Sequence, residues 1–308
     1  MADGADAAGP APRALDPLPH RARTAASVRI VVTTYNIHRA VGGDRRCDPL
    51  RIAETIAALD ADIVALQEVE TPARSEPLLL LRRLSEHGYR ALLGHTMRRG
   101  PHHYGNLLLT RFPISGHRLL DLSQPGREPR GLIDARLVLG AEPASPILRC
   151  LATHLGLRAR ERQRQIARIT TALDDPLPAG LAPDPVPDPV PDPVPDPVPE
   201  LAPELAPDGA SVPAPELAPD LAPDLARTLL LGDFNEWRNG SRRLAPINQR
   251  LASASCRASF PSAWPVLALD RIWHGRALAV ERIEAVRTPS TRAASDHLPV
   301  RAWLRWVA

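Results

Sequence analysis

A proline-rich acidic repeat constrains the fold of this 308-residue chain more than any other feature. Of the 35 prolines, 17 lie in residues 174–226, and Pro-Asp-Pro-Val units repeat from Pro183 to Pro199. Each proline removes a backbone N–H donor and disfavours helical geometry for the preceding residue, so this stretch forms neither a helix nor a central strand. We therefore predict that residues 174–226 are an extended, disordered insert within one folded domain, residues 27–308.

The charges of the chain are strongly segregated. Residues 174–226 contain 12 acidic residues and no basic residue. The remaining 229 residues, outside this insert and residues 1–26, contain 35 arginines and 20 acidic residues. Their formal net charge is +15. Such a basic domain favours an anionic partner, for example a phosphate ester, nucleic acid or a lipid headgroup. The alternative is that the arginines form a solvated surface without such a partner. The acidic insert itself is either a passive loop or a weak electrostatic shield over the basic domain.

The N-terminal stretch, residues 1–26, is rich in Ala, Pro and Asp and lacks the apolar segment of a signal peptide, so we expect a disordered arm. No apolar run in the chain approaches the roughly 18–20 residues that a membrane span needs. Three cysteines, Cys47, Cys150 and Cys256, are too few and too widely spaced for a disulfide framework or a zinc motif. We predict buried, inert thiols and a cytoplasmic, monomeric protein without stable membrane insertion.

The rest of the sequence alternates between strand-like and helix-like patterns. Residues 28–36 are β-branched and apolar, as in a buried strand, whereas Ile52 and Ile56 have helical spacing after the candidate cap Asp48. We predict strands at 28–36, 62–68, 106–110, 132–139, 147–154, 228–233, 271–274 and 301–306, and helices at 48–59, 77–87 and 158–173. This alternation indicates a single layered α/β domain.

Polar residues stand where the apolar runs end. These residues are Asn36, Glu68, His154, Asp233 with Asn235, and Asp270, and a sixth group, Ser295-Asp296-His297, precedes an apolar strand. One such residue alone is most often a turn former. Together they supply carboxylate, imidazole and amide groups, which suit a hard metal ion and a phosphate. We therefore predict that they meet at one edge of the sheets.

Seven short motifs, six of which contain these residues, run through residues 28–306. They are Tyr35-Asn-Ile-His, Leu66-Gln-Glu-Val, Gly105-Asn-Leu-Leu-Leu-Thr-Arg-Phe-Pro-Ile, Thr153-His-Leu, Gly232-Asp-Phe-Asn, Leu269-Asp-Arg-Ile and Ser295-Asp-His-Leu-Pro-Val. In this order and spacing they resemble the endonuclease/exonuclease/phosphatase superfamily, which includes pancreatic-type deoxyribonucleases, abasic-site endonucleases, neutral sphingomyelinases and inositol-polyphosphate phosphatases. The stretches after His154 and Asp233 are similar to a small bacterial branch of unassigned substrate.

The resemblance implies a fold and a metal. The fold is a four-layer α/β sandwich with two facing mixed β-sheets, interrupted here by the proline-rich insert. The site at one end of the sandwich depends on Mg²⁺, for which Mn²⁺ can substitute. Glu68 corresponds to the principal metal ligand, and Asp296 supports the metal or its waters. Asn36 lies beside the metal, where it is expected both as a metal ligand and as a contact of the substrate phosphate. Asn36 also orients Asp233, which positions or deprotonates the attacking water.

The resemblance also assigns residues that bind the phosphate. Asn235 is expected on an extended segment, where it faces the same side as Asp233 and holds a phosphate oxygen. His297 and Asp270 resemble the family's His–Asp pair, in which a buried carboxylate keeps the imidazole protonated so that it stabilises the five-coordinate phosphate. Three further phosphate contacts are expected. His154 is a second catalytic residue that contacts the phosphate, and Arg130 and Arg162 bind the substrate phosphate. Arg162 has a second possible role, which is to orient the loop that follows His154.

These assignments predict a Mg²⁺-dependent phosphoric-ester hydrolase that cleaves P–O bonds by in-line attack of water. The basic domain favours a nuclease, so nucleic acid is the expected partner. A phospholipid-type phosphodiesterase that binds anionic lipid, or a phosphomonoesterase, is the alternative. Against a lipid substrate, the sequence has no amphipathic helix with an aromatic face and no lipidation signal. A non-catalytic phosphate-binding protein is a remote alternative, because every matched position holds a competent residue.

Overall fold

The computed structural model describes residues 28–72, 79–140, 145–177, 225–238, 240–254 and 257–307. The predicted N-terminal arm and most of the predicted insert, residues 178–224, lie outside the described residues. The predicted start of the insert at residue 174 is wrong, because Asp174 is the last residue of helix α3 (Ala159–Asp174). Asp174 and Asp175 pair with Arg250 and Arg118 at 2.5 and 2.6 Å. The folded part of the chain therefore includes these first residues of the acidic stretch.

Twelve strands among the described residues form two mixed sheets of six strands each. The first sheet has the order β11 (Leu278–Ala285), β12 (Val300–Trp306), β1 (Arg29–Asn36), β2 (Ile63–Pro72), β4 (His102–Thr110) and β3 (Arg90–Arg99). The second has the order β5 (Ile114–Asp121), β6 (Gly131–Val138), β7 (Ile147–His154), β8 (Thr228–Asp233), β10 (Asp270–His274) and β9 (Ala252–Ser253). The β1–β2 and β7–β8 pairs are parallel, and the other described neighbours are antiparallel.

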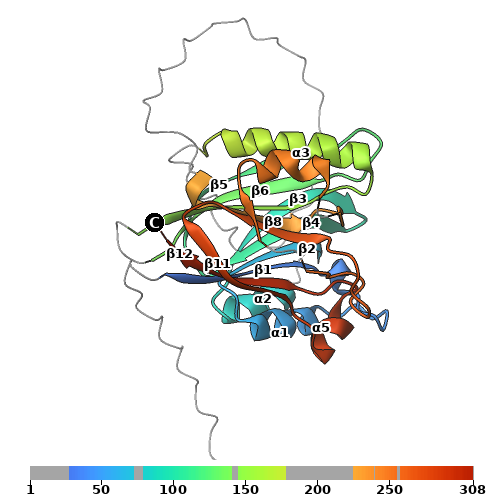
Figure 1. The fold of residues 1–308 in the computed structure, drawn as a ribbon. Coiled ribbons are helices and arrows are strands. Elements are labelled where there is room, and N and C mark those ends of the chain that lie inside the picture. Colours follow the sequence, from blue (N-terminus) through green and yellow to red (C-terminus); the bar gives the residue numbers. More distant parts are fainter. Residues whose placement is uncertain are drawn as a thin grey trace, which may run out of the picture.

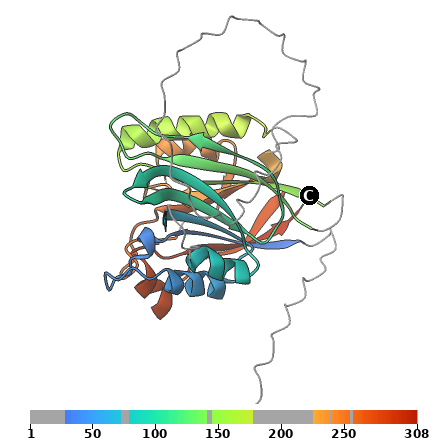
Figure 2. The same cartoon turned by 180° about the vertical axis from the view of Figure 1, so that it is seen from behind.

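Helices cover the outer face of each sheet, as Figures 1 and 2 show. Helices α1 (Pro49–Leu59), α2 (Leu79–Glu86) and α5 (Pro289–Ala294) lie on the side of the first sheet, whereas α3 and α4 (Ala245–Asn248) lie on the side of the second. Three short 3-10 helices are η2 (His38–Ala40), η4 (Leu225–Arg227) and η5 (Arg242–Leu244). None of the described helices combines the length and the apolar character needed to cross a membrane. The predicted four-layer α/β sandwich with two facing mixed sheets is confirmed.

Helix α1 forms where its sequence predicts it. The Asp48 side chain accepts a hydrogen bond from the Arg51 N–H at 3.0 Å and so caps the helix, and Pro49 occupies the first helical position. Ile52 and Ile56, one turn apart, are fully buried. This apolar face holds the helix against the first sheet.

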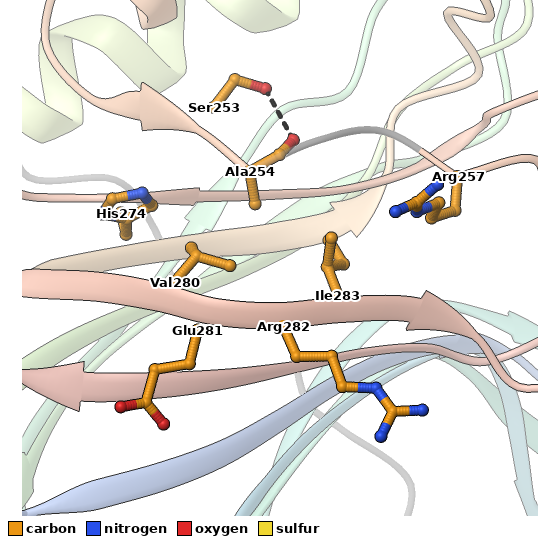
Figure 3. A pocket seen from close by; sticks show the side chains of 8 residues that line it. All are labelled: Ser253, Ala254, Arg257, His274, Val280, Glu281, Arg282 and Ile283. Carbon is orange, nitrogen blue, oxygen red and sulfur yellow. Dashed lines mark hydrogen bonds between the residues drawn. The ribbon is translucent and has the colours of Figure 1, made fainter.

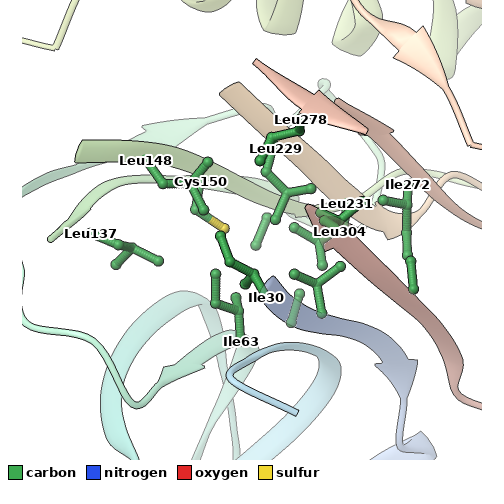
Figure 4. Packing of buried hydrophobic residues seen from close by; sticks show 14 of the residues in the cluster. Ile30, Ile63, Leu137, Leu148, Cys150, Leu229, Leu231, Ile272, Leu278 and Leu304 are labelled. Carbon is green, nitrogen blue, oxygen red and sulfur yellow. The ribbon is translucent and has the colours of Figure 1, made fainter. Parts of the chain in front are cut away.

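Apolar side chains of the two sheets meet in the middle of the sandwich (Figure 4). Ile30 and Ile63 of the first sheet lie in one cluster with Leu148 and Leu229 of the second, and all four are fully buried. Burial of a side chain of this size contributes about 1.5–3 kcal/mol. The contact between the sheets therefore fixes how they face each other, and with it the distance between residues on different sheets.

The cysteines differ in their surroundings. Cys150 lies in this central cluster, where burial raises the pKa of its thiol. The prediction of a buried thiol is wrong for Cys47, which is exposed in the loop before α1. Charged residues flank it in this loop, Asp44-Arg-Arg before it and Asp48 after it, and the Cys47 Sγ contacts the Arg39 carbonyl at 3.5 Å. Cys256 lies outside the described residues.

All eight predicted strands and three predicted helices are present, with boundaries within about four residues of the prediction. Four observed strands were not predicted, namely β3, β5, β9 and β11. These are the four edge strands of the two sheets. The interior strands were all predicted from sequence.

Candidate active site

The carboxyl ends of the two parallel strand pairs meet at one edge of the sandwich. In the first sheet Asn36, the last residue of β1, pairs with Gln67 of β2. In the second sheet His154 and Asp233 end β7 and β8 and pair with each other, while Asp270 pairs with Asp233. The Asn36 Nδ2 donates to Asp233 Oδ2 at 3.1 Å and so links the two sheets. The predicted residues meet here, although Asp270 begins β10 instead of ending a strand.

Glu68 lies inside β2 and not at a strand end, which corrects our prediction. The strand continues to Pro72, and its pairing with β4 shifts register between Leu66 and Val69. This bulge gives Glu68 a φ of +58°, a left-handed conformation that is strained for a residue with a side chain. The Glu68 Oε1 accepts a hydrogen bond from Asn36 Nδ2 at 3.1 Å. The bulge therefore turns the carboxylate toward the other site residues.

Asn235 has a conformation that the sequence did not predict. We expected an extended segment, but Asn235 has a φ of +49°, and its N–H donates to Asp233 Oδ1 at 2.9 Å in a tight turn. The Asn235 Nδ2 donates to the Leu155 carbonyl at 2.8 Å and faces His154 Nε2 at 3.1 Å. The turn thus fixes the Asp233 carboxylate and places Asn235 beside His154.

His297 and Asp270 form a buried pair. The His297 Nδ1 lies 2.8 Å from Asp270 Oδ2, which also accepts a hydrogen bond from Ser259 Oγ at 2.5 Å. Burial by itself lowers the pKa of His297, but the Asp270 carboxylate outweighs burial and, with Asp233 and Asp296, raises the pKa to about 10. The ring is therefore protonated at neutral pH. Its Nε2 lies 3.8 Å from Asp233 Oδ2, so a cation and a carboxylate face each other.

His154 is uncharged, in contrast to His297. Burial is the main cause that lowers the pKa of His154, and Arg130 lowers it further, to about 3, although Asp233 acts in the opposite direction. The Asn235 amide donates to Nε2, which leaves the ring proton on Nδ1. His154 therefore brings a neutral imidazole to the site, and the positive charge comes from His297.

Oxygen groups that suit a cation gather around Asn36. Glu68 Oε1 and Asp233 Oδ2 accept from the same Asn36 Nδ2, so the two carboxylates lie on either side of this amide. Asp296 lies next to them, because Ser295 Oγ donates to the Asn36 carbonyl at 2.7 Å and contacts Asp296 Oδ1 at 3.3 Å. Carboxylate oxygens are the ligands that Mg²⁺ prefers in proteins. This set therefore fits a hard divalent cation.

A second set of possible ligands consists of Asp233, Asp270 and His297, whose ligand atoms lie within 4.8 Å of one another. Within this set, His297 Nδ1 and Asp270 Oδ2 are already paired with each other at 2.8 Å, and the same Oδ2 accepts from Ser259 Oγ. The oxygen set around Asn36 is therefore the better cation site. Asn36 itself, which we assigned as a ligand, has both amide hydrogens on carboxylates, and its Oδ1 accepts the His38 N–H at 3.0 Å. Asn36 therefore orients the carboxylate ligands Glu68 and Asp233, while its own side-chain oxygen is occupied by the His38 N–H.

Arg162 is buried, and groups of the protein itself occupy its guanidinium. Its Nη1 donates to the Leu157 carbonyl at 2.6 Å, and its Nη2 pairs with Glu236 Oε2 at 3.4 Å. The buried Glu236 also accepts two hydrogen bonds from Arg271 at its backbone carbonyl. The phosphate-binding role that we preferred for Arg162 is therefore replaced by its alternative role, in which it orients the loops after β7 and β8.

Arg130 borders the site at the start of β6. It is 7% exposed, and its Nη1 pairs with Glu128 Oε1 at 2.5 Å. Asn106 Nδ2 and Thr153 Oγ1, from different sheets, both donate to the carbonyl of the next residue, Gly131, at 3.0 Å. These bonds hold the segment with Arg130 between the sheets.

Sequence reasoning missed several side chains that orient the site. Ser295 adjoins the Asp296-His297 motif, and this position was a usable signal. Ser259 lies 11 positions before Asp270 in no motif, and nothing in the sequence marks it. His38, whose Nδ1 lies 3.8 Å from Asp296 Oδ1, follows Asn36 closely but received no role. These residues contact the predicted ones only after the chain has folded.

A cavity of about 450 Å³ lies apart from this cluster, between β9, β10 and β11. Val280 and Ile283 point toward the β10 side of it, whereas Glu281 and Arg282 point the opposite way (Figure 3). Its wall includes His274, the last residue of β10, while the candidate site uses the first residue of that strand. The cavity therefore contributes no residue to the candidate site.

Comparison with known proteins defines the family. The model of the Endonuclease/Exonuclease/phosphatase family matches residues 33–297, a range that contains every candidate site residue, and the chain belongs to this family. The Escherichia coli (strain K12) protein YbhP, described as uncharacterized, is 27% identical over 288 residues, which are 88% of this chain and 94% of YbhP. Members of the family act as nucleases, phosphodiesterases or phosphatases and generally depend on a divalent metal.

Two solved structures share the fold. An endonuclease/exonuclease/phosphatase from Beutenbergia cavernae DSM 12333 superposes with a TM-score of 0.61 at 21% identity and covers 90% of this chain and 72% of its own. The catalytic domain of human Nocturnin with a bound sulfate anion has a TM-score of 0.61 at 17% identity and covers 90% of this chain and 93% of its own. At these identities the comparison establishes the fold and not the substrate.

Proposed function

We propose that this chain is a Mg²⁺-dependent phosphodiesterase and that its substrate is nucleic acid. The observation that carries the proposal is the opposition of Asp233 and His297. A carboxylate that can accept a proton and a protonated imidazole lie 3.8 Å apart where the two sheets end. A general base and a cation this close together suit the attack of water on a phosphate held between them.

A divalent cation fits the oxygen groups of Glu68 and Asp296, next to Asp233. When bound, it would supply positive charge to a phosphoryl oxygen and to the departing oxygen. Mg²⁺ is the expected ion because the ligands are carboxylates, and Mn²⁺ accepts the same oxygen ligands. Asn36 supports this arrangement, since its single amide nitrogen holds Glu68 and Asp233 on either side.

Residues of the chain take up the proton of the attacking water and stabilise the negative charge that develops on the phosphate. Asp233, held by Asn36 at Oδ2 and by the Asn235 N–H at Oδ1, orients the attacking water and takes up its proton. The water oxygen bonds to phosphorus while the P–O bond opposite it breaks, and the departing oxygen keeps the bonding electrons. His297 donates from Nε2 to the phosphoryl oxygen on which negative charge grows. Asp270 keeps the proton on the ring by stabilising the imidazolium.

Nucleic acid is the proposed substrate because of the arginine excess. The residues outside 1–26 and 174–226 carry a formal +15, and displacement of counterions from a polyphosphate is a large term in binding. Arg158 and Arg160 are exposed at the start of α3, shortly after His154 in the chain. A long anion could therefore contact several arginines beyond the catalytic phosphate.

A phospholipid is the second candidate substrate, and one observation favours it. Four exposed apolar residues, Leu157, Trp237, Trp264 and Val266, stand on loops that carry site residues. Trp264 is 76% exposed, and two positions before it the Ser262 N–H donates to the Asp296 carbonyl at 2.6 Å. Exposed tryptophan with aliphatic neighbours is typical of side chains that enter a membrane interface.

One panel separates these candidates. Purified protein with Mg²⁺ is assayed against single- and double-stranded DNA, RNA, anionic phospholipid vesicles and inositol phosphates, with Asp233→Asn as the inactive control. We expect cleavage of a nucleic acid, no cleavage with EDTA, and a loss of at least about 10²-fold in the variant. Hydrolysis of phospholipid alone would replace nucleic acid as the substrate. Equal activity of wild type and Asp233→Asn would refute the mechanism.

A further inference from the structure

Two exposed tryptophans stand on neighbouring loops at the edge of the sandwich that carries the candidate active site. Trp237 follows β8 and is 51% exposed, and Trp264 precedes β10 and is 76% exposed. Because β8 and β10 are antiparallel neighbours, the loop after β8 and the loop before β10 leave the second sheet at this same edge. The Phe234 N–H donates to the Leu269 carbonyl at 2.9 Å and so joins the two loops.

The backbone that carries Trp237 is anchored, although its ring is exposed. The preceding residue, Glu236, is buried, and its carbonyl accepts two hydrogen bonds from Arg271 at 3.0 and 2.6 Å. The Glu236 carboxylate pairs with Arg162 at 3.4 Å and with Arg243 at 3.3 Å. The chain therefore presents the Trp237 ring to solvent from a fixed point beside the site.

The loop that carries Trp264 is anchored to the catalytic residues themselves. The Ser262 N–H donates to the Asp296 carbonyl at 2.6 Å. The Phe260 ring packs against the His297 ring, and their centroids are 4.8 Å apart. Trp264 projects from this loop and is mostly exposed, so the loop is fixed at its base while its indole remains open to a ligand.

An exposed arginine accompanies each tryptophan. The Cζ of Arg238 lies over the Trp237 ring, 4.9 Å from its centroid. The Arg287 Nη2 donates to the carbonyl of Ala263, the residue before Trp264, at 3.1 Å. A guanidinium on one face of an indole leaves the other face free for stacking. Insertion of such a pair into a membrane would strip water from the charge, whereas a base stacked on the free face leaves the guanidinium in water beside a phosphate.

We infer that Trp237 and Trp264 stack on unpaired bases on the two sides of the cleaved phosphate, and that the substrate is therefore a single-stranded nucleic acid. The inference rests on the proposed function, which places the reacting phosphate between Asp233 and His297. Trp237 follows Asp233 on one loop, and the loop of Trp264 packs on His297, so each ring belongs to one side of this phosphate. A base in a duplex would first have to leave its pair and its stack.

The first test separates the bases from the charge. Fluorescence anisotropy in EDTA measures the binding of a short labelled oligothymidylate and of an abasic strand with the same number of phosphates. We expect wild type to bind the oligothymidylate at least about fivefold more tightly, because stacking on an aromatic side chain contributes about this much or more per base. The ratio should fall toward one in the double variant Trp237→Leu/Trp264→Leu. Failure to bind either strand, equal affinities in wild type, or an unchanged ratio in the double variant overturns the inference.

Two control variants show whether the aromatic faces at these two positions are the cause. Replacement of both tryptophans by Tyr keeps an aromatic face and should retain most of the preference for bases. Trp303→Leu removes a half-buried ring on β12, where the Cζ atoms of Arg282 and Arg301 lie 4.7 and 4.5 Å from its centroid, and should keep the full preference. An equal loss in the Tyr and Leu double variants, or a loss in Trp303→Leu, would overturn the stacking assignment.

The second test compares the other possible occupants of the two rings. The same assay compares the single strand with the strand annealed to its complement, and flotation with phosphatidylserine vesicles and analytical ultracentrifugation are run in parallel. We expect the single strand to bind at least about fivefold more tightly than the duplex. Tighter binding of the duplex overturns the inference. Vesicle binding or self-association that is lost in Trp237→Leu/Trp264→Leu, without any preference for bases, would assign the rings to a membrane or to a second copy of the chain.

These outcomes separate the inference from the proposed function. A preference for bases that depends on the two tryptophans, in a protein that hydrolyses no phosphodiester, would leave the stacking assignment standing and remove the proposed activity. Hydrolysis of nucleic acid without any such preference would do the reverse.

Discussion

Asn36 Nδ2 lies 3.1 Å from Asp233 Oδ2, and this hydrogen bond joins residues that are 197 positions apart in the sequence. Asn36 ends β1 of the first sheet, and Asp233 ends β8 of the second. The same nitrogen donates to Glu68 Oε1 at 3.1 Å. The distance between the proposed metal ligand Glu68 and the proposed base Asp233 therefore depends on how the two sheets stack.

Replacement of Glu68 by Gln should abolish hydrolysis and weaken Mg²⁺ binding while the fold stays intact. The amide keeps the shape of the side chain but loses the negative charge that a hard cation requires. Titration calorimetry should show a loss of Mg²⁺ affinity of at least about 10–100-fold. Glu54→Gln, at an exposed carboxylate on α1, is the control and should bind Mg²⁺ like wild type. Unchanged affinity in Glu68→Gln would exclude Glu68 from the metal site.

His297→Ala and Asp270→Asn should each remove most of the turnover, by about 10²–10³-fold, because a preorganised charged donor is lost in both. The double variant should be little worse than His297→Ala alone, since the two residues supply one cation together. A double-mutant cycle on kcat at saturating Mg²⁺ measures this coupling, and KM should change far less than kcat. Fully additive losses would mean that the residues act independently.

The charge of His297 should persist well above neutral pH. Its folded-state pKa is about 10, above the ordinary value of 6.5, so the ring should remain protonated from pH 6 to 9 in an NMR titration. The stability that this proton contributes is fully present below pH 6.5 and is lost as the pH rises through about 10. Asp270→Asn should lower the midpoint by about one to three pH units. A wild-type ring that titrates near pH 6.5 would contradict the assigned charge state.

Arg162→Met should act through the loops that carry Asn235 and His154. The variant loses the bonds to the Leu157 carbonyl and to Glu236, and the free energy of unfolding should fall by about 1–3 kcal/mol. If Arg162 positions these loops, kcat should fall while the slope of activity against salt stays at the wild-type value. Arg168→Met, at an exposed arginine on the same helix, should keep both stability and kcat. A shallower salt dependence in Arg162→Met would restore its predicted contact with a phosphate.

Interior strands such as β2, β7 and β8 were predictable from sequence because most of their residues are apolar. The strands β2, β7 and β8 are covered on both faces by the other sheet and by helices, and such burial selects apolar residues at every position. Edge strands lack this signal. β11 reads Leu-Ala-Val-Glu-Arg-Ile-Glu-Ala, and β3 is mostly exposed or half-buried. Their strand geometry comes from pairing with a neighbour, which a single segment does not reveal.

The sequence by itself determined which chemical groups are available and that they adjoin apolar runs. Asn36, Glu68, His154, Asp233, Asp270 and His297 were all identified in this way. Only the tertiary structure decided their conformations, since the bulge at Glu68 arises from pairing with β4, and the Asn235 side chain is held by the Leu155 carbonyl of the loop after β7. It also decided that His297 is charged and His154 neutral. Both rings are buried, but only His297 has a carboxylate within hydrogen-bond distance of its Nδ1. Burial and the nearest charge set a pKa, and both exist only once the two sheets have packed.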